Sequence, residues 1–390
     1  MKNKNPIKDR FLILKIWKHL SKEKKNRILF YFIIMILSGF AELVTVSSVI
    51  PFLTVLLNPE KLLNLPISFF LERILYISES QDLYVPIIAL FGICVILSTS
   101  LRLYNLHLNY DIAASVGAEL SVKTFSNNLH QSYEFHLINN SSRLISQSTT
   151  FINQTVASIS NFFILISNII LSIALSVSIF LINGKVSIYL LIIFILVYFY
   201  LGKTVNKEVR VNSKIIASSE ELLVKSIQEV LGSIRDILLN SNQNLYTSIH
   251  KNIEVEKRKK QARNQFIGEF PRYGIEGLAL LIVIIISLFS IRESTQSTSL
   301  IIFLGGFVLG IQRLLPSIQR IYLSFVLLAG YNSDLLKTLE MLELKVKRLN
   351  RNILPLDFKK SIKFNNVSFS YNKKGTPIIK NLNLEIHKGQ

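Results

Sequence analysis

Apolar residues form long runs along this chain, and polar, strongly basic segments separate the runs. A helix needs about 20 mostly apolar residues to cross a bilayer. Runs near or above this length are Ile28–Leu57, Leu83–Leu106, Ile159–Ile182, Val186–Leu201, Tyr273–Ile291 and Leu300–Leu328. The pattern therefore predicts an all-α membrane protein with six long transmembrane helices.

The segments that connect these runs differ in length in an alternating way. Asn109–Ser158 and Lys203–Phe270 are long, whereas Asn183–Lys185 and Arg292–Ser299 are short. Within Ser218–Leu239 the apolar residues recur at helical spacing. The long connections are therefore predicted to be helical extensions that leave the membrane on one side, where twenty residues reach about 30 Å.

Two alternating apolar runs near the C-terminus, Ile362–Phe369 and Ile378–Ile386, flank a turn that contains Gly375 and Pro377. This pattern predicts a β-hairpin. An isolated hairpin is marginally stable in water, so we expect it to begin a larger domain. The predicted domains are an arm at 1–27, a transmembrane domain at 28–345, a linker at 346–358 and the start of a second domain at 359–390.

Charge gives the predicted orientation. The chain has 44 Lys and Arg against 25 Asp and Glu, a net charge of +19. Basic residues gather in the N-terminal arm and in Lys203–Arg272, whereas Asn58–Asp82 is richer in acids. By the positive-inside rule, both termini and both long connections are predicted to be cytoplasmic. The charge therefore favours a membrane topology over nucleic-acid binding.

The basic arm contains a candidate interfacial helix. In Arg10–Leu20, Phe11, Leu14 and Trp17 fall on one helical face, with basic residues elsewhere. This pattern is typical of a helix lying in the membrane interface. A basic soluble arm is the alternative. The six histidines and the single Cys94 show no metal-ligand spacing, so no metal site is predicted.

Charged residues within the apolar runs, or directly at the start of one in the case of Arg272, are the candidate substrate-binding residues. Such a charge costs about 2.5–3.5 kcal/mol at the centre of a span and is usually functional. The candidates are Arg102, Arg272, Arg313, Arg320, Glu42 and Glu276. We expect the arginines in the inner half of the membrane or at its inner interface, where guanidinium groups suit a phosphate-bearing headgroup. Two alternatives stay open: the arginines snorkel to the interface, or the acids pair with them structurally.

Together these features resemble the membrane half of an ABC exporter. The tail "NVSFSYNKKGTPIIKNLNLEIHKGQ" resembles the first strands of its nucleotide-binding domain. The resemblance implies that Tyr371 stacks on the adenine of ATP. It also implies coupling helices that dock on this domain at the two cytoplasmic turnarounds, near Leu129–Ser142 and Gln228–Asn242. The residues expected to couple are Tyr133, Glu134, Arg235 and Asp236.

The phosphate-binding parts of that family are not found in these 390 residues. The sequence contains no G-x-x-x-x-G-K-[ST] motif, and the signature and Walker B motifs of the family do not occur either. We therefore expect a fragment of a longer protein or an inactive truncation. ATP with Mg is the expected cofactor, but only in a complete nucleotide-binding domain, and ATP hydrolysis by this chain stays uncertain.

Among the ABC exporters, three stretches of the sequence resemble one subgroup, the bacterial lipid-linked oligosaccharide flippases. They are Glu42 with the following "LVTVSSVIPF", "FPRYGIEGLAL" and "GIQRLLPSIQRI". The resemblance implies a homodimer in the bacterial plasma membrane that moves a lipid-linked oligosaccharide or another anionic amphiphile, with the arginines facing the cavity. A peptide or drug exporter of the same fold, or a passive channel or scaffold without ATPase activity, is the alternative.

Overall fold

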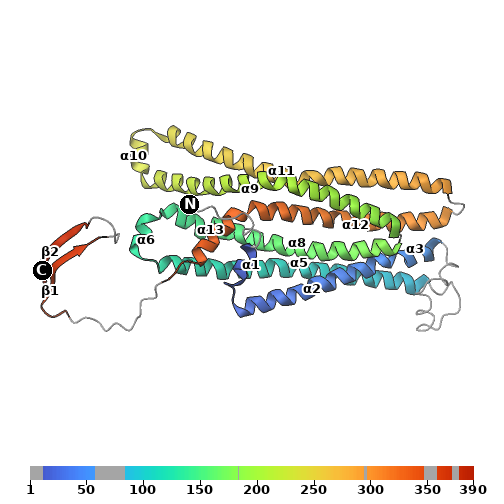
Figure 1. Ribbon diagram of the computed structural model, residues 1–390, viewed down its shortest axis with the longest axis horizontal. Helices are drawn as coiled ribbons and strands as arrows, with labels where there is room; N and C mark the ends of the chain where they lie inside the picture. The colour runs from blue at the N-terminus through green and yellow to red at the C-terminus, as the bar shows by residue number, and fades with distance from the viewer. Residues whose placement is uncertain (1–11, 58–83, 183, 294–296, 347–357, 371–376) are drawn as a thin grey trace.

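The computed structural model describes residues 12–57, 84–182, 184–293, 297–346, 358–370 and 377–390. These residues form a bundle of long helices followed by a two-stranded antiparallel sheet (Figure 1). The long helices are α2 (Lys22–Ser47), continued by α3 (Val49–Leu57), α5 (Tyr84–Leu129), α8 (Thr150–Ile182), α9 (Gly184–Gly232), α11 (Gln243–Glu293) and α12 (Ser297–Gly330). The shorter elements are α1 (Leu12–Trp17), α6 (Tyr133–Ile138), α7 (Ser141–Ser148), α10 (Ile234–Leu239), α13 (Asn332–Leu342), β1 (Ser361–Phe369) and β2 (Ile379–His387).

Each apolar run predicted to span the membrane lies on helices, which confirms the predicted fold class. The first run is the one that breaks, because α2 ends at Ser47 and α3 begins at Val49. Pro51 lies in the first turn of α3, where the missing N–H of proline costs no helical hydrogen bond. By contrast, α12 continues through Pro316.

Hydropathy supports a membrane location for these helices. Among the described residues, three stretches are long and apolar enough to cross a bilayer: Lys22–Leu56, Tyr84–Leu129 and Ser141–Leu181. Val308–Gly330 and α13, which meet at a bend of 53°, make a fourth if they are counted as one span. The protein is therefore a multi-pass membrane protein.

Several helices are much longer than a bilayer requires. α5 has 46 residues, α9 has 49 and α11 has 51. At 1.5 Å per residue, helices of this length extend about 70 Å, roughly twice the hydrocarbon thickness. α6 and α10 lie at the end of the bundle that also faces the sheet, whereas α3 lies at the opposite end (Figure 1). The extensions therefore project from one end of the bundle, as the sequence predicts.

Among the described residues, buried apolar side chains gather in at least two clusters. One cluster joins α1, α2, α5, α8 and α13 and includes Tyr31, Leu120 and Phe163. A second joins α9, α11 and α12 through Val209, Ile267, Tyr322 and Val326. α8 lies at the centre of the bundle, where it packs against α2, α5 and α12.

Small and polar residues allow the helices to approach closely. The Asn105 amide donates to Ser167 Oγ at 2.9 Å, which ties α5 to α8. Ser172 and Ser317 share a hydrogen bond of 2.8 Å between α8 and α12. Gly117 on α5 lies directly against Val156 on α8. Within a membrane, where the hydrophobic effect between helices is weak, polar contacts such as Ser172 with Ser317 help to hold helices together. The Gly117 contact lies in the predicted extension, where it lets α5 and α8 pack closely.

The N-terminal helix α1 differs in part from its predicted placement. Leu12 and Ile16, which lie off the predicted membrane face, are buried in the main cluster, and α1 packs against α13. Trp17 packs partly against the same cluster, whereas Leu14 is exposed. Phe11 lies outside the described residues. The helix thus uses apolar residues on more than one face, because protein lies beside it as well as solvent or lipid.

The turn after α1 is fixed to α5 by hydrogen bonds. The Ser21 N–H and hydroxyl donate to the two oxygens of Glu119, at 2.8 and 2.9 Å. Lys123 Nζ donates to the carbonyl of His19 at 3.0 Å. These bonds set the position of α1 on the bundle and give α2 a defined start at Lys22.

The two strands confirm the predicted hairpin. Ile362 pairs with Ile386, and Phe364 pairs with Leu384, in antiparallel register. Asn366 adopts a φ of 51° at an irregularity in that register, a conformation that asparagine tolerates better than most residues. Ile362 and Leu384 are exposed, which is expected of strands that belong to a larger sheet.

Candidate functional site

Glu42, Arg102 and Arg313 come together from three helices to form a charged cluster, which we call the Glu42 cluster. Glu42 lies on α2, and its side chain is only 1% exposed. Arg313 on α12 donates from Nη1 to Glu42 Oε1. Arg102 on α5 places its Nη1 3.6 Å from the same oxygen. Two predicted arginines therefore share one predicted acid.

Burial makes this pairing energetically necessary. A carboxylate removed from water is costly unless a cation and hydrogen bonds compensate for the lost hydration. Arg313 supplies both for Glu42 Oε1, while Glu42 Oε2 is buried and has no hydrogen-bond partner among the described residues. The guanidinium-bearing side chains are more accessible, with Arg313 38% and Arg102 54% exposed. The Glu42 cluster thus holds two positive charges against one buried negative charge.

Two of the remaining candidates, Arg272 and Glu276, form a separate group on α11 that Gln319 of α12 also contacts. Arg272 Nε donates to Glu276 Oε1 at 3.0 Å, one helical turn further along α11. Gln319 on α12 donates weakly to the same oxygen at 3.5 Å. Arg272 is 57% exposed. No ion pair of the described residues joins this group to the Glu42 cluster.

Arg320 does not join either group. It is exposed and forms no ion pair with any described side chain. Arg313 and Arg320 are seven residues apart on α12 and share a helical face, as their spacing predicts. A shared face on one helix did not bring them to a common partner, because the partner carboxylate of Arg313 comes from α2.

The two predicted cytoplasmic turnarounds each contain a short helix. Tyr133 and Glu134 lie on α6, whose N-cap is Ser132, and Arg235 and Asp236 lie on α10. Both helices sit at one end of the bundle (Figure 1). Tyr133 is 69% exposed. The location fits a docking surface, and the coupling role of these four residues stays a prediction.

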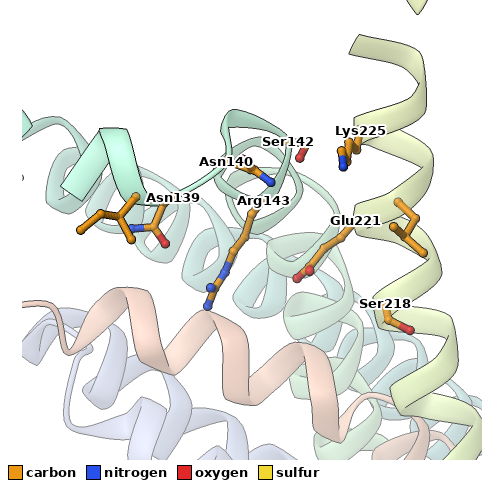
Figure 2. A pocket seen from close by; sticks show the side chains of 9 residues that line it. Asn139, Asn140, Ser142, Arg143, Ser218, Glu221 and Lys225 are labelled. Atoms are coloured by element: carbon orange, nitrogen blue, oxygen red, sulfur yellow. The ribbon is translucent and has the colours of Figure 1, made fainter. Parts of the chain in front are cut away.

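A pocket of about 410 Å³ lies beside α6, between α7 and α9. Figure 2 shows Arg143, Glu221 and Lys225 around it, with Asn139, Asn140, Ser142 and Ser218. Each charged side chain already has an ion-pair partner: Arg143 pairs with Glu340 at 3.6 Å, Lys225 with Glu229 at 3.6 Å, and Glu221 with Lys337. The pocket therefore offers balanced charge, with no surplus that would favour an anion or a cation.

A buried charged junction, which sequence reasoning missed, joins α9, α11 and α13. Lys257 on α11 lies 3.0 Å from both Glu220 on α9 and Glu254 on its own helix. Nearby on α13, Asp334 is 6% exposed. Burial raises the pKa of Asp334 to about 7, with Glu220 raising it further and Lys337 opposing. No short motif marks this junction, because its members come from three helices and the segment from Glu220 to Asp334 is more than a hundred residues long.

Two further predictions concern adenine stacking and metal binding. Tyr371, the predicted adenine-stacking residue, lies outside the described residues. Across the described ranges, no group of three or more His, Cys, Asp and Glu side chains is placed to hold a metal ion.

Together these observations define a class: a multi-pass helical transporter domain whose long helices carry short transverse helices at one end. The sequence model of the ABC transporter transmembrane region matches residues 28–315. This match begins in α2, ends within α12, and covers more than half of the chain. The chain therefore belongs to the ABC transporter transmembrane region family and has the fold of an ABC exporter.

Proposed function

We propose that this chain forms the membrane path of an ATP-driven exporter for an anionic amphiphile, such as a lipid-linked oligosaccharide. The observation that carries the proposal is the Glu42 cluster, in which two partly exposed arginines surround a single buried carboxylate. Its surplus positive charge favours an anion. Guanidinium groups bind phosphate through paired hydrogen bonds, so a phosphate-bearing lipid headgroup fits this site.

Coupling to ATP is the second part of the proposal. α6 and α10 lie together at one end of the bundle, where a nucleotide-binding domain would contact both. In that assembly Tyr133, Glu134, Arg235 and Asp236 transmit closure of the ATP-bound domains, and Tyr371 stacks on the adenine. ATP with Mg then drives the bundle between an inward-facing and an outward-facing state.

The proposed assembly is a homodimer in the bacterial plasma membrane, with both termini in the cytoplasm. One set of six spans supplies half of a transport cavity in this arrangement, and a second copy supplies the other half. Light scattering in detergent, corrected for the mass of bound detergent, tests the oligomeric state, since a dimer has twice the 44.5 kDa mass of the chain.

A transport assay tests the substrate class. The chain is assembled with a complete nucleotide-binding domain in vesicles that contain a fluorescent polyprenyl-pyrophosphate oligosaccharide. We expect ATP-dependent movement of this lipid, and no movement of a neutral polyprenyl glycoside of equal length. Movement without ATP would favour a passive channel. ATPase stimulation by peptides or apolar drugs, with no stimulation by the pyrophosphate lipid, would favour a peptide or drug exporter.

A further inference from the structure

We propose that Glu42 gives its two neighbouring arginines different roles. It holds Arg313 in place and leaves Arg102 as the group that binds the substrate phosphate. This inference rests on the proposed function, because it assigns roles within the same site. It makes Glu42 a positioning residue and separates two side chains that sequence alone treats as equivalent.

The two arginines differ in how Glu42 holds them. Arg313 donates a hydrogen bond to Glu42 Oε1. Arg102 Nη1 lies 3.6 Å from that oxygen, which is too long for a hydrogen bond and leaves a charge attraction alone. Arg102 is also the more exposed of the two, at 54% against 38%. A phosphate that binds Arg102 therefore displaces no existing hydrogen bond.

Binding at Arg313 is less favourable for the same physical reasons. An incoming anion must compete there with a carboxylate that the fold already holds in contact. Its success would leave Glu42, which is 1% exposed, as a buried charge without its hydrogen-bonded cation. Arg313 thus serves chiefly to hold the Glu42 side chain in place.

The proximity of Arg102 to Glu42 Oε1 gives the site a means of release. Glu42 Oε2 is buried and has no hydrogen-bond partner among the described residues. After the phosphate leaves, Arg102 can approach this carboxylate and recover a charged contact. Because Glu42 competes for Arg102 in this way, it weakens anion binding enough to permit release, which transport requires as much as capture.

The test uses the full chain in nanodiscs of zwitterionic phosphatidylcholine, with inorganic pyrophosphate as the probe. Binding is measured by calorimetry and stability by the thermal unfolding midpoint without pyrophosphate. The variants are Arg102→Gln, Arg313→Gln and the double variant Glu42→Gln/Arg313→Gln. The charge-matched control is Arg258→Gln, which removes an exposed arginine on the non-membrane part of α11.

We expect Arg102→Gln to unfold at nearly the wild-type temperature and to bind pyrophosphate at least tenfold more weakly. Arg313→Gln should unfold at a clearly lower temperature, because Glu42 loses its hydrogen-bonded cation. The double variant should recover that temperature and bind pyrophosphate as tightly as wild type or more tightly. Arg258→Gln should match wild type in both measurements.

Two results would overturn this inference while leaving the proposed function intact. In the first, Arg102→Gln keeps wild-type affinity. In the second, the double variant recovers stability but binds as weakly as Arg102→Gln, which would make Arg313 an anion ligand. Failure of wild type to bind pyrophosphate or a short-chain polyprenyl pyrophosphate would instead reject the anionic substrate, and this inference with it.

A second arm identifies the source of the phosphate. Phosphatidylglycerol is added to the nanodiscs, and pyrophosphate affinity is measured again. Competition in wild type that disappears in Arg102→Gln would assign the site to a bilayer phospholipid headgroup. Unchanged affinity would assign it to a pyrophosphate-bearing substrate. With either outcome, the tenfold loss of binding in Arg102→Gln is the result that identifies Arg102 as the phosphate ligand.

Discussion

At the scale of single residues, position in the packed bundle decides what each charge does. Glu42 and Asp334 are both buried acids. Arg313 donates a hydrogen bond directly to Glu42, whereas the pKa of Asp334 is governed mainly by burial. Sequence reasoning found Glu42 because it interrupts an apolar run. It missed Asp334, which follows the last predicted span in a stretch of ordinary polarity.

Replacement of Asp334 by Asn should change how stability depends on pH. Burial raises the pKa of Asp334 from its ordinary 3.8 to about 7 in the folded protein. The folded state therefore binds this proton more tightly, so the stabilisation is complete below about pH 4 and is lost as pH rises through 7. Three pKa units correspond to about 4 kcal/mol at most.

The measurement is the thermal unfolding midpoint between pH 5 and pH 8.5. The wild-type midpoint should fall across this range, and Asp334→Asn should flatten the profile and be the more stable protein at pH 8. Asp236→Asn, which changes an exposed aspartate on α10, should keep the wild-type slope. Parallel profiles for Asp334→Asn and wild type would contradict the prediction.

Gly117 provides a second prediction at this scale. A Cβ at this position would lie 2.3 Å from Val156 Cγ2, so Gly117→Ala forces the Val156 side chain or the two helices to shift. We expect a loss of about 1–3 kcal/mol in unfolding free energy, as in other overpacked contacts. Val156→Ala should recover much of it. Gly92→Ala on the same helix meets nothing within 4 Å and should be neutral or slightly stabilising.

At the scale of elements, the helices were predictable and their ends were not. Apolar runs located every predicted span, since the number of residues needed to cross lipid is set by bilayer thickness. The runs did not show that α2 begins at Lys22, or that α13 follows α12 at a bend of 53°. Such boundaries depend on contacts with other helices, for example Ser21 with Glu119.

The junction between α9 and α11 carries a prediction of its own. Lys257 is only 9% exposed and faces two carboxylates, and its hydrogen bond lowers the pKa of Glu254. Lys257→Met should cost about 2–4 kcal/mol, because Glu220 and Glu254 then lie close together without a cation. Chemical denaturation in detergent measures the loss.

Lys225→Met is the matched control for this experiment. Lys225 pairs with Glu229 on the surface of α9 and is 49% exposed, so its loss should change stability by about 0.5 kcal/mol or less. Equal effects of the two substitutions would show that the junction contributes no more than a surface ion pair.

At the scale of the whole molecule, the arrangement places α6 and α10 at one end and α3 at the other (Figure 1). The distribution of basic residues predicts that the α6 and α10 end is cytoplasmic. Glu134→Cys and Arg235→Cys, each in a Cys94→Ser background, should therefore react with a membrane-impermeant maleimide in inverted vesicles but not in intact cells.

The opposite end supplies the control for this labelling experiment. Leu56 lies near the end of α3 and is exposed, so Leu56→Cys should react in intact cells. If Leu56→Cys and Glu134→Cys reacted from the same side, the crossing pattern would be wrong. If the two reacted from reversed sides, the fold would stand and the predicted orientation would be wrong.

Local patterns in the sequence were enough to predict the membrane class, the helical runs, the gathering of the extensions at one end of the bundle and the hairpin. Each of these follows from local composition and periodicity, because these decide whether a segment is stable in water or in the bilayer. Which charges meet could be learned only from how the helices pack. Glu42 and Arg313 are 271 residues apart, and Arg320 shares a helix face with Arg313 without sharing its partner. An ion pair depends on distances of a few ångströms between separate helices, and these distances are set by packing of the whole bundle.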